Sequence, residues 1–431
     1  MKKINIGLIG FGNVGSGVVK ILREKRALLA NKIGLEINIK KICDKDTISK
    51  RNVFVDKRLL TENVEEIIND PQIDIVIELI GGIHPAKEYM IGALKKGKNI
   101  VTANKALLAQ EGRELFALAR DRDKNIYFEA SVGAGIPIIK SLREGLVANK
   151  FYSIFGIVNG TSNFILSQMS GENRTFNDAL KEAKLRGFAE KKPTLDIEGI
   201  DSAHKLALLT YLCFGRLVDL DDIFTEGISQ ISLADVNYAK ELGLEVKLLA
   251  IAKREVDELE VRVHPTLIPK THLLSSVTGI FNAIYVSCDL AGNILFYGPG
   301  AGQMPAASAV VADLVDLTQG IKAGLFRPTL NVVADKSIRK LRKIDEIESR
   351  YYIRFMALDK PGVLAKISGV LAKFGISIAS VTQKERRKTQ VVPIVMIIHE
   401  AKEKHLRAAL EAIDRLNVIK QKSVAIRMEE V

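Results

Sequence analysis

Short apolar segments alternate with amphipathic ones over the first third of the chain. The segments whose composition and length predict strands are Ile4 to Ile9, Glu36 to Ile42, Ile73 to Ile80, Asn99 to Ala103 and Asn125 to Glu129. Helical periodicity falls between them, at Val14 to Leu29 and at Lys105 to Arg122. This alternation predicts a parallel, doubly wound sheet covered by helices, with a ligand crevice at the carboxyl ends of its strands.

The pattern becomes a mixture of longer helices and strands between residues 136 and 302. Helices are predicted at Thr175 to Gly187, Ile200 to Phe214 and Leu233 to Leu242. Strands are predicted at Ser153 to Val158, Leu248 to Lys253, Glu258 to Pro265 and Asn282 to Cys288. A glycine-rich run at 298–302 then leads into a helix from Ala306 to Gly320, and we expect residues 303–325 to return to the first domain.

A polar, charged stretch at 326–349 has the composition of a linker. Beyond it, residues 350–431 predict the order strand–helix–strand–strand–helix–strand, which is ferredoxin-like. The apolar segments behind this prediction are Tyr352 to Leu358, Val363 to Phe374, Ser377 to Thr382, Val391 to His399, Leu406 to Leu416 and Ser423 to Met428.

Charge and cysteine usage restrict the classes of function. The formal net charge is +12, but acidic residues interrupt the basic ones, and the densest basic run, Lys384 to Lys388, contains no aromatic residue. We therefore expect a solvated loop there and no nucleic-acid partner. No apolar run is long enough to span a membrane, and glycines break the apolar N-terminal stretch, which argues against a signal peptide. Three widely spaced cysteines, Cys43, Cys213 and Cys288, favour a reducing compartment, so we expect a cytoplasmic protein.

A G-x-G-x-x-G motif lies between the first strand and the first helix. Its residues are Gly10, Phe11, Gly12, Asn13, Val14 and Gly15. The first glycine allows a tight turn, the second lets the backbone approach a diphosphate at the helix N-terminus, and the third permits close packing. In this context the motif predicts a dinucleotide-binding Rossmann domain over residues 1–135, followed by an α+β substrate and dimerisation domain over 136–302.

The residues after the second strand give conflicting indications about the nucleotide. Asp44 could bind the free ribose of NAD, but it comes later than the usual spacing of about 20 residues. Lys45 is next to it, and Lys41, Lys50 and Arg51 are near, which suits the extra phosphate of NADP. We favour NADP, with use of NAD also open.

Asp201 and Lys205 are spaced to lie on one helical face. A lysine can exchange a proton with a substrate hydroxyl, although by itself this spacing is far more often that of a solvated ion pair. The preceding segment, from Gly187 through Glu190, Pro193, Asp196 and Gly199, resembles the signature of homoserine dehydrogenases. Similar stretches occur at 101–105, 129–137, 159–163 and 298–302, so the resemblance covers residues 1 to about 330.

The resemblance implies a role for each matching residue. Lys205 would exchange the hydroxyl proton, and Lys105 would lie between nicotinamide and substrate, where a second positive charge favours the neutral form of its neighbour. Glu190 and Asp201 would hold the ammonium and hydroxyl groups of homoserine, with Asp196 supporting them. The substrate crevice would be lined by Asn159, Gly160 and Thr161, and the cofactor would be approached by Thr102, Gly187 and Gly302.

The resemblance also implies a monovalent cation, most simply sodium. Its ligands would be Glu129 and the main-chain carbonyl groups of Val132, Ala134 and Ile136, an oxygen-only set that suits a hard ion. In one place the sequence departs from the family pattern: Lys192, instead of an acidic residue, precedes Pro193.

The C-terminal module resembles the ACT domain in the run Asp359, Lys360, Pro361, Gly362, Val363, Leu364 and in the later Gly375 and Gln383. The resemblance implies pairing between subunits and an amino-acid effector, threonine, bound near Asp359, Gly362, Val363 and Leu364. A module kept only for oligomerisation is the alternative. We expect a homo-oligomer, a dimer or a tetramer.

The resemblance to homoserine dehydrogenases implies NAD(P)-dependent interconversion of L-homoserine and L-aspartate 4-semialdehyde in threonine, methionine and isoleucine biosynthesis. With nothing before the Rossmann motif that could be a kinase, a monofunctional enzyme is expected. No cysteine has the polar setting of a nucleophile, which argues against an acyl-phosphate-forming aldehyde dehydrogenase. Another amino-acid or hydroxy-acid dehydrogenase remains possible, as does a non-catalytic amino-acid sensor that retains the nucleotide fold.

Overall fold

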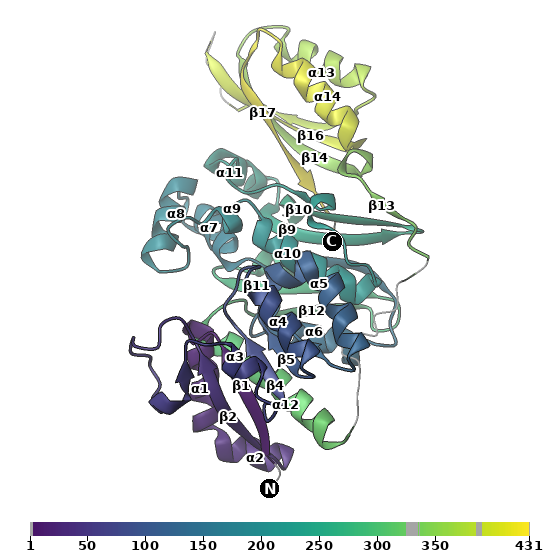
Figure 1. Ribbon diagram of the computed structural model, residues 1–431. Helices are drawn as coiled ribbons and strands as arrows, with labels where there is room; N and C mark the ends of the chain where they lie inside the picture. The colour runs from purple at the N-terminus through teal and green to yellow at the C-terminus, as the bar shows by residue number, and fades with distance from the viewer. Residues whose placement is uncertain (1–2, 325–334, 336, 385–389, 431) are drawn as a thin grey trace. The chain divides into compact units, whose positions relative to one another are not determined.

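The computed structural model describes residues 3–324, 335, 337–384 and 390–430 (Figure 1). The predicted linker and the basic run at 384–388 lie partly outside these ranges. The chain forms two compact units, the first made of residues 1–151, 204–220 and 288–335 and the second of residues 152–203, 221–287 and 336–431. None of the described helices is both long and apolar enough to cross a membrane.

The first unit contains a parallel sheet in the order β3-β2-β1-β4-β5-β6. Its strands are β1 (Lys3–Ile9), β2 (Glu36–Cys43), β3 (Leu60–Thr61), β4 (Ile75–Glu78), β5 (Asn99–Thr102) and β6 (Ile126–Tyr127). Its helices are α1 (Asn13–Glu24), α2 (Arg26–Ile33), α3 (Glu65–Ile68), α4 (Ala86–Lys95), α5 (Lys105–Asp121) and α6 (Ile138–Lys140). This strand order is that of a dinucleotide-binding fold, so the predicted doubly wound sheet is confirmed.

A later segment of the chain, β12 (Asn293–Pro299) followed by α12 (Gln303–Lys322), belongs to the same unit. Val310, Leu314 and Leu317 of α12 share one apolar core with Val18 and Leu22 of α1 and with strand residues. The helix predicted over Val14 to Leu29 is instead two helices that meet at Lys25, and Gly34 ends the second one in the left-handed conformation.

The second unit is built on a mixed sheet in the order β11-β7-β9-β10-β17-β14-β16-β15, with β8 and β13 also paired to β10. Its strands before residue 300 are β7 (Phe151–Ile157), β8 (Phe224–Thr225), β9 (Leu244–Glu255), β10 (Glu258–Pro269) and β11 (Phe281–Cys288). Its helices there are α7 (Gly160–Glu172), α8 (Phe176–Leu185), α9 (Thr194–Ile197) and α11 (Leu233–Glu241); α10 (Ile200–Phe214) begins in this unit and continues in the first.

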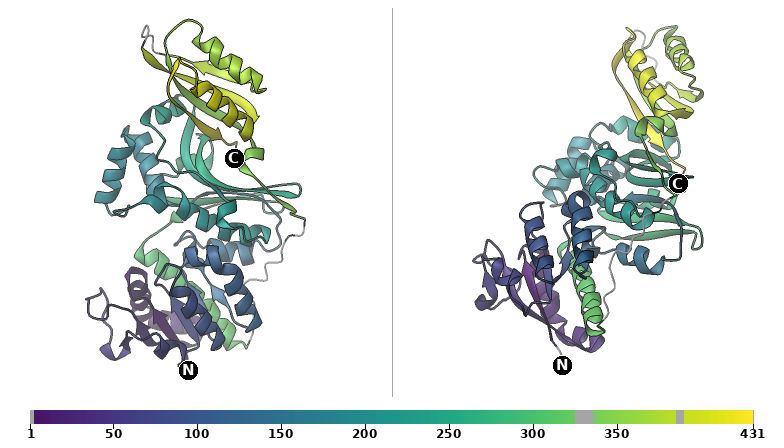
Figure 2. Two further views of the ribbon diagram at one scale, coloured as in Figure 1. Left: turned by 45° about the horizontal axis from the view of Figure 1, so that its top comes forward. Right: turned by 45° about the vertical axis from the view of Figure 1, so that its right-hand side comes forward.

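The remainder of the second unit, described over 337–384 and 390–430, is called the C-terminal module below. It contains β13 (Lys340–Arg342), β14 (Glu348–Leu358), α13 (Val363–Lys373), β15 (Ile378–Thr382), β16 (Val391–Lys402), α14 (Glu403–Asp414) and β17 (Ile419–Met428). Figure 2 shows α13 and α14 side by side on one face of its sheet, where Ile367, Leu406 and Ile413 join an apolar core. From β14 to β17 the predicted βαββαβ order is confirmed, and β13 is a further strand within the range predicted as linker.

Candidate active site

Steric contacts show why the loop after β1 requires glycine at two positions. Gly10 has a φ of 101°, and a Cβ there would lie 2.7 Å from the Leu79 carbonyl carbon. A Cβ on Gly15 would lie 2.1 Å from the Gly10 carbonyl oxygen. A Cβ on Gly12, by contrast, would meet no described atom within 4 Å. Since Gly12 is also the N-cap of α1 and offers no side-chain cap, this open side fits a diphosphate bound to free backbone N–H groups.

Asp44 and Arg51 both hold the glycine loop from the end of β2. The Asp44 carboxylate accepts hydrogen bonds from the Phe11 N–H and, at 2.9 Å, from the Asp46 N–H. Arg51 donates from Nε to the Phe11 carbonyl oxygen at 2.9 Å and lies over the Phe11 ring. Lys45 is exposed. Arg51 Nη1 and Nη2 also lie 3.4 Å from Asp46 Oδ2, so the guanidinium is fixed next to the glycine loop, in the region where a dinucleotide places its ribose.

The glycine-rich turn before α12 lies close to this loop. Gly302 has a φ of 125°, and the next residue, Gln303, donates from Nε2 to the Asn13 carbonyl oxygen and to Ser16 Oγ, both at 3.0 Å. A Cβ on Gly17 would lie 3.0 Å from Gln303 Cγ. The structure thus brings together the two glycine-rich segments that the sequence indicated, through a glutamine that sequence reasoning missed.

Glu78, also missed from the sequence, fastens two loops at the carboxyl ends of β4 and β5. Its carboxylate is fully buried and accepts hydrogen bonds from Thr102 Oγ1 at 2.7 Å and from the Ile80 N–H at 2.8 Å. Thr102 Oγ1 in turn accepts from the Asn104 N–H at 3.0 Å, and Asn104 caps α5, which begins at Lys105. Burial raises the pKa of Glu78. An acidic residue that closes an apolar strand was the signal in the sequence that could have identified it.

One asparagine holds two of the predicted substrate carboxylates. Asn159 Nδ2 donates to Asp196 Oδ1 at 2.7 Å and to Asp201 Oδ2 at 2.9 Å. Its Oδ1 accepts from the Ser162 N–H at 2.9 Å and so caps α7, whose first residue is Gly160. Because an amide is neutral, these bonds orient the two carboxylates without cancelling their charge.

The other predicted substrate and proton-transfer residues lie on neighbouring segments. Asp201 and Lys205 are both 8% exposed and lie one turn apart on α10. Thr161 Oγ1 donates to the Phe188 carbonyl oxygen at 2.6 Å, which fixes the segment that carries Gly187 and Glu190. Gly187, Glu190 and Lys192 are exposed. Lys105 and Lys205 belong to the first unit, whereas Glu190, Asp196, Asp201 and Asn159 belong to the second.

The segment predicted to hold a cation is buried. The two carboxylate oxygens of Glu129 accept hydrogen bonds from the Ile139 and Lys140 N–H groups, each at 2.8 Å. The Glu129 N–H donates to Asp313 Oδ2 at 2.7 Å, and burial raises the pKa of both carboxyl groups. The carbonyl ligands would come from Val132, Ala134 and Ile136, which are also buried. Among the described residues no group of three or more His, Cys, Asp or Glu side chains is placed to bind a metal, so a cation here would depend on main-chain oxygens, which suit a monovalent ion.

The predicted effector loop leads into α13. Gly362 is the N-cap of this helix, with a φ of 82°, and lacks a side-chain cap. Asp359 Oδ1 accepts from Gln383 Nε2 at 3.3 Å, so the two halves of the ACT-like pattern meet. Val363 is buried, whereas Leu364 is 44% exposed. The Val363 N–H donates to the Lys360 carbonyl oxygen at 3.3 Å, and a helix start without a side-chain cap suits a carboxylate.

Comparison with known proteins identifies the same regions. The family described as homoserine dehydrogenase matches residues 137–315, its NAD-binding domain matches 10–129, and the ACT domain matches 351–418. The homoserine dehydrogenase of Neisseria gonorrhoeae is 42% identical over 434 residues, which covers all of both chains.

Solved structures agree with this comparison. The crystal structure of a homoserine dehydrogenase from Thiobacillus denitrificans has a TM-score of 0.90 and 43% identity, and the match covers 100% of this chain and 99% of that one. A hyperthermophilic archaeal homoserine dehydrogenase in complex with NADPH has a TM-score of 0.62 and 28% identity, over 75% of this chain and all of that one.

Proposed function

Because the chain belongs to the homoserine dehydrogenase family, we propose that it interconverts L-homoserine and L-aspartate 4-semialdehyde and that Lys205 carries the hydroxyl proton. The enzyme is an NAD(P)-dependent oxidoreductase that acts on a hydroxyl group. The observation that carries the assignment of residues is the Asn159 amide, which holds Asp196 and Asp201 together one helical turn before Lys205.

We assign the proton transfer to Lys205. In the direction of reduction, a bound dihydronicotinamide nucleotide would supply the hydride for the aldehyde carbon, and negative charge would develop on the aldehyde oxygen. The Lys205 ammonium then gives that oxygen its proton; oxidation reverses both transfers. Lys105, at the start of α5, supplies a second positive charge near the developing alkoxide and favours proton release from its neighbour.

The carboxylates recognise the amino-acid end of the substrate. Glu190 and Asp201 bind the ammonium and hydroxyl groups, and Asp196 orients this set through the shared Asn159 amide. Gly160 and Thr161 form the adjoining wall at the start of α7. A hydroxy acid without the ammonium group would leave these carboxylates uncompensated, which favours an amino-acid substrate.

The cofactor is NADP in preference to NAD. Gly12 and Gly302 let the backbone approach it, Asp44 reaches its ribose, and Arg51, which like Asp44 binds the Phe11 main chain, supports a 2′-phosphate. Burial raises the pKa of the Glu129 carboxyl group, and a sodium ion bound there would favour its ionised form. The C-terminal module binds threonine at the start of α13 as a feedback inhibitor, in a homo-oligomer.

Three unpaired cysteines favour the cytoplasm as the location of the protein.

The proposal is tested by following the absorbance of NADPH, and then of NADH, in the presence of L-aspartate 4-semialdehyde. Each assay is run with and without L-threonine. We expect faster turnover with NADPH, inhibition by threonine, and loss of at least about a thousandfold in kcat for Lys205→Ala with NADPH binding retained. Exposed Lys192→Ala is the control and should leave kcat unchanged. Absence of turnover with either nucleotide would remove this function.

A further inference from the structure

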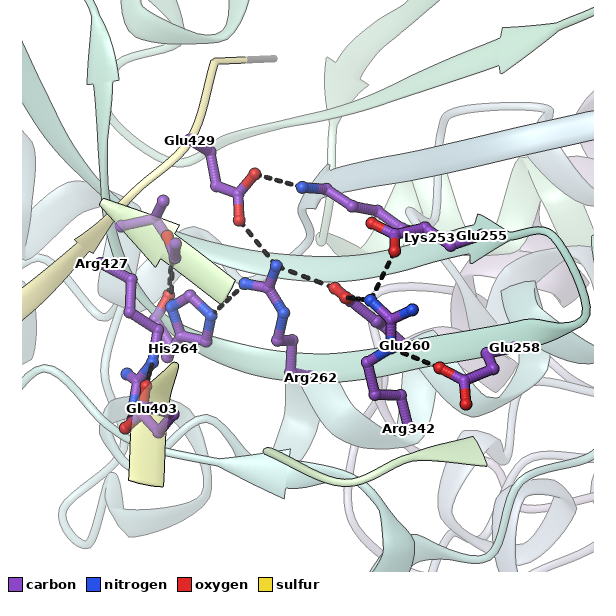
Figure 3. Close-up of polar contacts among 12 residues, drawn as sticks. Lys253, Glu255, Glu258, Glu260, Arg262, His264, Arg342, Glu403, Arg427 and Glu429 are labelled. Atoms are coloured by element: carbon purple, nitrogen blue, oxygen red, sulfur yellow. Dashed lines mark hydrogen bonds and ion pairs between the residues drawn. The ribbon is translucent and has the colours of Figure 1, made fainter. Parts of the chain in front are cut away.

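The last strand of the C-terminal module also joins the sheet of the substrate region, defined as residues 152–203 and 221–287. Arg427 and Met428 of β17 pair in parallel with Thr266 and Leu267 of β10, and the Glu429 N–H donates to the Leu267 carbonyl oxygen at 3.0 Å. Figure 3 shows Arg427 and Glu429 against β10, where Glu429 binds Arg262 at 2.7 Å. The end of β17 is therefore fastened to β10, which packs against Gly199 of residues 196–201, called here the substrate loop.

Arg427 connects carboxylates from both sides of this junction. Arg427 is 5% exposed, and its guanidinium binds both oxygens of Glu403, with Nε at 2.9 Å and Nη2 at 2.6 Å. The remaining Nη1 donates to Glu226 at 2.8 Å, and the group lies 4.8 Å from the centre of the Phe224 ring. One rigid, planar cation thus links the first residue of α14 to the substrate region.

Glu226 lies in residues 224–229, called here the bridging segment, which lies against the main chain of the substrate loop. A Cβ on Gly227 would lie 2.3 Å from the Ile197 carbonyl oxygen and 2.5 Å from Glu198 Cα. The Ile228 N–H donates to that same Ile197 oxygen at 2.8 Å. Ser229 Oγ donates to Glu198 Oε1 at 2.6 Å.

The substrate loop has little freedom to move independently of this segment. Ile197 and Glu198 lie between Asp196 and Asp201, the two carboxylates held by Asn159. A Cβ on Gly199 would lie 3.1 Å from Val263 and 3.2 Å from Thr225, so β8 and β10 leave no space behind the loop. A displacement of the bridging segment must therefore move the main chain between the two carboxylates.

We propose that Glu226 is a positioning residue for the amino-acid substrate. Through its ion pair with Arg427 of the C-terminal module, Glu226 determines the position of the loop from Asp196 to Asp201. This rests on the proposed function only in naming those carboxylates as the substrate ligands. The link predicts that the C-terminal module determines substrate affinity even when no effector is bound.

The first test is Glu226→Gln in the full-length chain. The Glu226 side chain is 38% exposed, and Arg427 keeps Glu403 as its partner, so the variant should fold. We expect the KM for L-aspartate 4-semialdehyde to rise about 3- to 10-fold, with kcat and the KM for NADPH within about twofold of the parent values. In an Arg427→Lys background, Glu226→Gln should raise the KM for L-aspartate 4-semialdehyde by less than about twofold, because the ion pair is already weakened.

Glu241→Gln is the matched control. Glu241 pairs with Lys384 of the same module, and its side chain is 52% exposed, but it is the last residue of α11 and belongs neither to the bridging segment nor to the substrate loop. Its KM values should not change. Equal KM increases in both variants, or a joint rise in the KM for NADPH and loss of thermal stability in Glu226→Gln, would assign Glu226 a general structural role and overturn the proposal.

Amide hydrogen exchange gives a readout that does not require turnover. The Ile228 amide, which donates to Ile197, should exchange faster in Glu226→Gln than in the parent and in Glu241→Gln. If the parent chain proves inactive with this substrate, the proposed function fails, but the exchange result still decides whether Glu226 holds the loop. Unchanged exchange in Glu226→Gln would overturn the positioning role.

Discussion

At the residue scale, Gly12 and Gly15 show that one motif contains glycines of different purpose. The Cα of Gly15 faces the Gly10 carbonyl oxygen, whereas that of Gly12 faces open space. The spacing in the sequence indicated both roles, but only the contacts separate a glycine required by the fold from one required by the ligand.

Alanine substitutions should distinguish the two glycines. We expect Gly15→Ala to destabilise the nucleotide-free protein by about 1–3 kcal/mol, because the added methyl group cannot fit beside Gly10. Gly12→Ala should leave the nucleotide-free Tm unchanged but weaken NADPH binding by at least about tenfold, because its methyl group occupies the place of the diphosphate. Thermal unfolding and NADPH fluorescence titration measure the two effects. An equal loss of Tm in both variants would contradict the distinction.

At the element scale, β9 and β10 extend further than the apolar pattern predicted. Strands were expected at Leu248 to Lys253 and Glu258 to Pro265. The two strands instead pair over their full lengths, from Leu244 opposite Pro269 to Glu255 opposite Glu258. At the start of β9 a buried charged residue, Lys247, interrupts the apolar pattern. Lys247 is 1% exposed and donates from Nζ to the Val277 carbonyl oxygen at 2.6 Å.

Lys247 gives the fold a defined pH dependence. Burial lowers its pKa to about 8, below the unfolded value of about 10.4. Between these values the unfolded chain binds more protons, so stability should rise with pH from about 8 to 10. Lys247→Met should remove that rise and increase stability at pH 7 by about 1–3 kcal/mol. Urea unfolding at pH 7 and pH 10 measures the free energy of unfolding, and Lys181→Met, at an exposed position, is the control. A Lys247→Met protein that is less stable than the parent at pH 7 would refute this account.

At the scale of the second unit, a buried ion pair joins the C-terminal module to the helix before β9. Arg354 of β14 donates to both carboxylate oxygens of Asp235, from Nε at 2.6 Å and from Nη2 at 3.1 Å, and the Tyr352 hydroxyl donates to the same group. Asp235 also completes a capping box with Ser232 at the start of α11. Together with Arg427, this pair makes the module part of one folded body with the substrate region.

Arg354→Met should therefore destabilise this body more than removal of a surface pair does. It leaves the Asp235 charge buried, and we expect a loss of about 3–5 kcal/mol, part of which Asp235→Asn should restore in the double variant. Arg350→Met, which removes an ion pair with the exposed Glu430, should cost less than about 1 kcal/mol. Urea unfolding followed by far-UV circular dichroism measures all three. Equal losses for Arg354→Met and Arg350→Met would show that the buried pair contributes no more than the surface one.

The sequence by itself determined the fold class, the glycine loop and the family. Strand and helix periods, glycine spacing and the Glu190–Lys205 signature are local properties, so they can be identified without knowing which segments meet. Even the exact extent of α10 follows from its apolar pattern.

The tertiary structure decided which distant groups share a hydrogen bond. Glu78 and Gln303 lie outside any motif, because their roles depend on contacts with Thr102 and Asn13. The same holds for Glu226, which became a candidate only when the chain's last strand placed Arg427 beside it. A charged side chain in the sequence predicts solvent exposure; whether it is instead buried against an opposite charge depends on long-range packing, which no local pattern encodes.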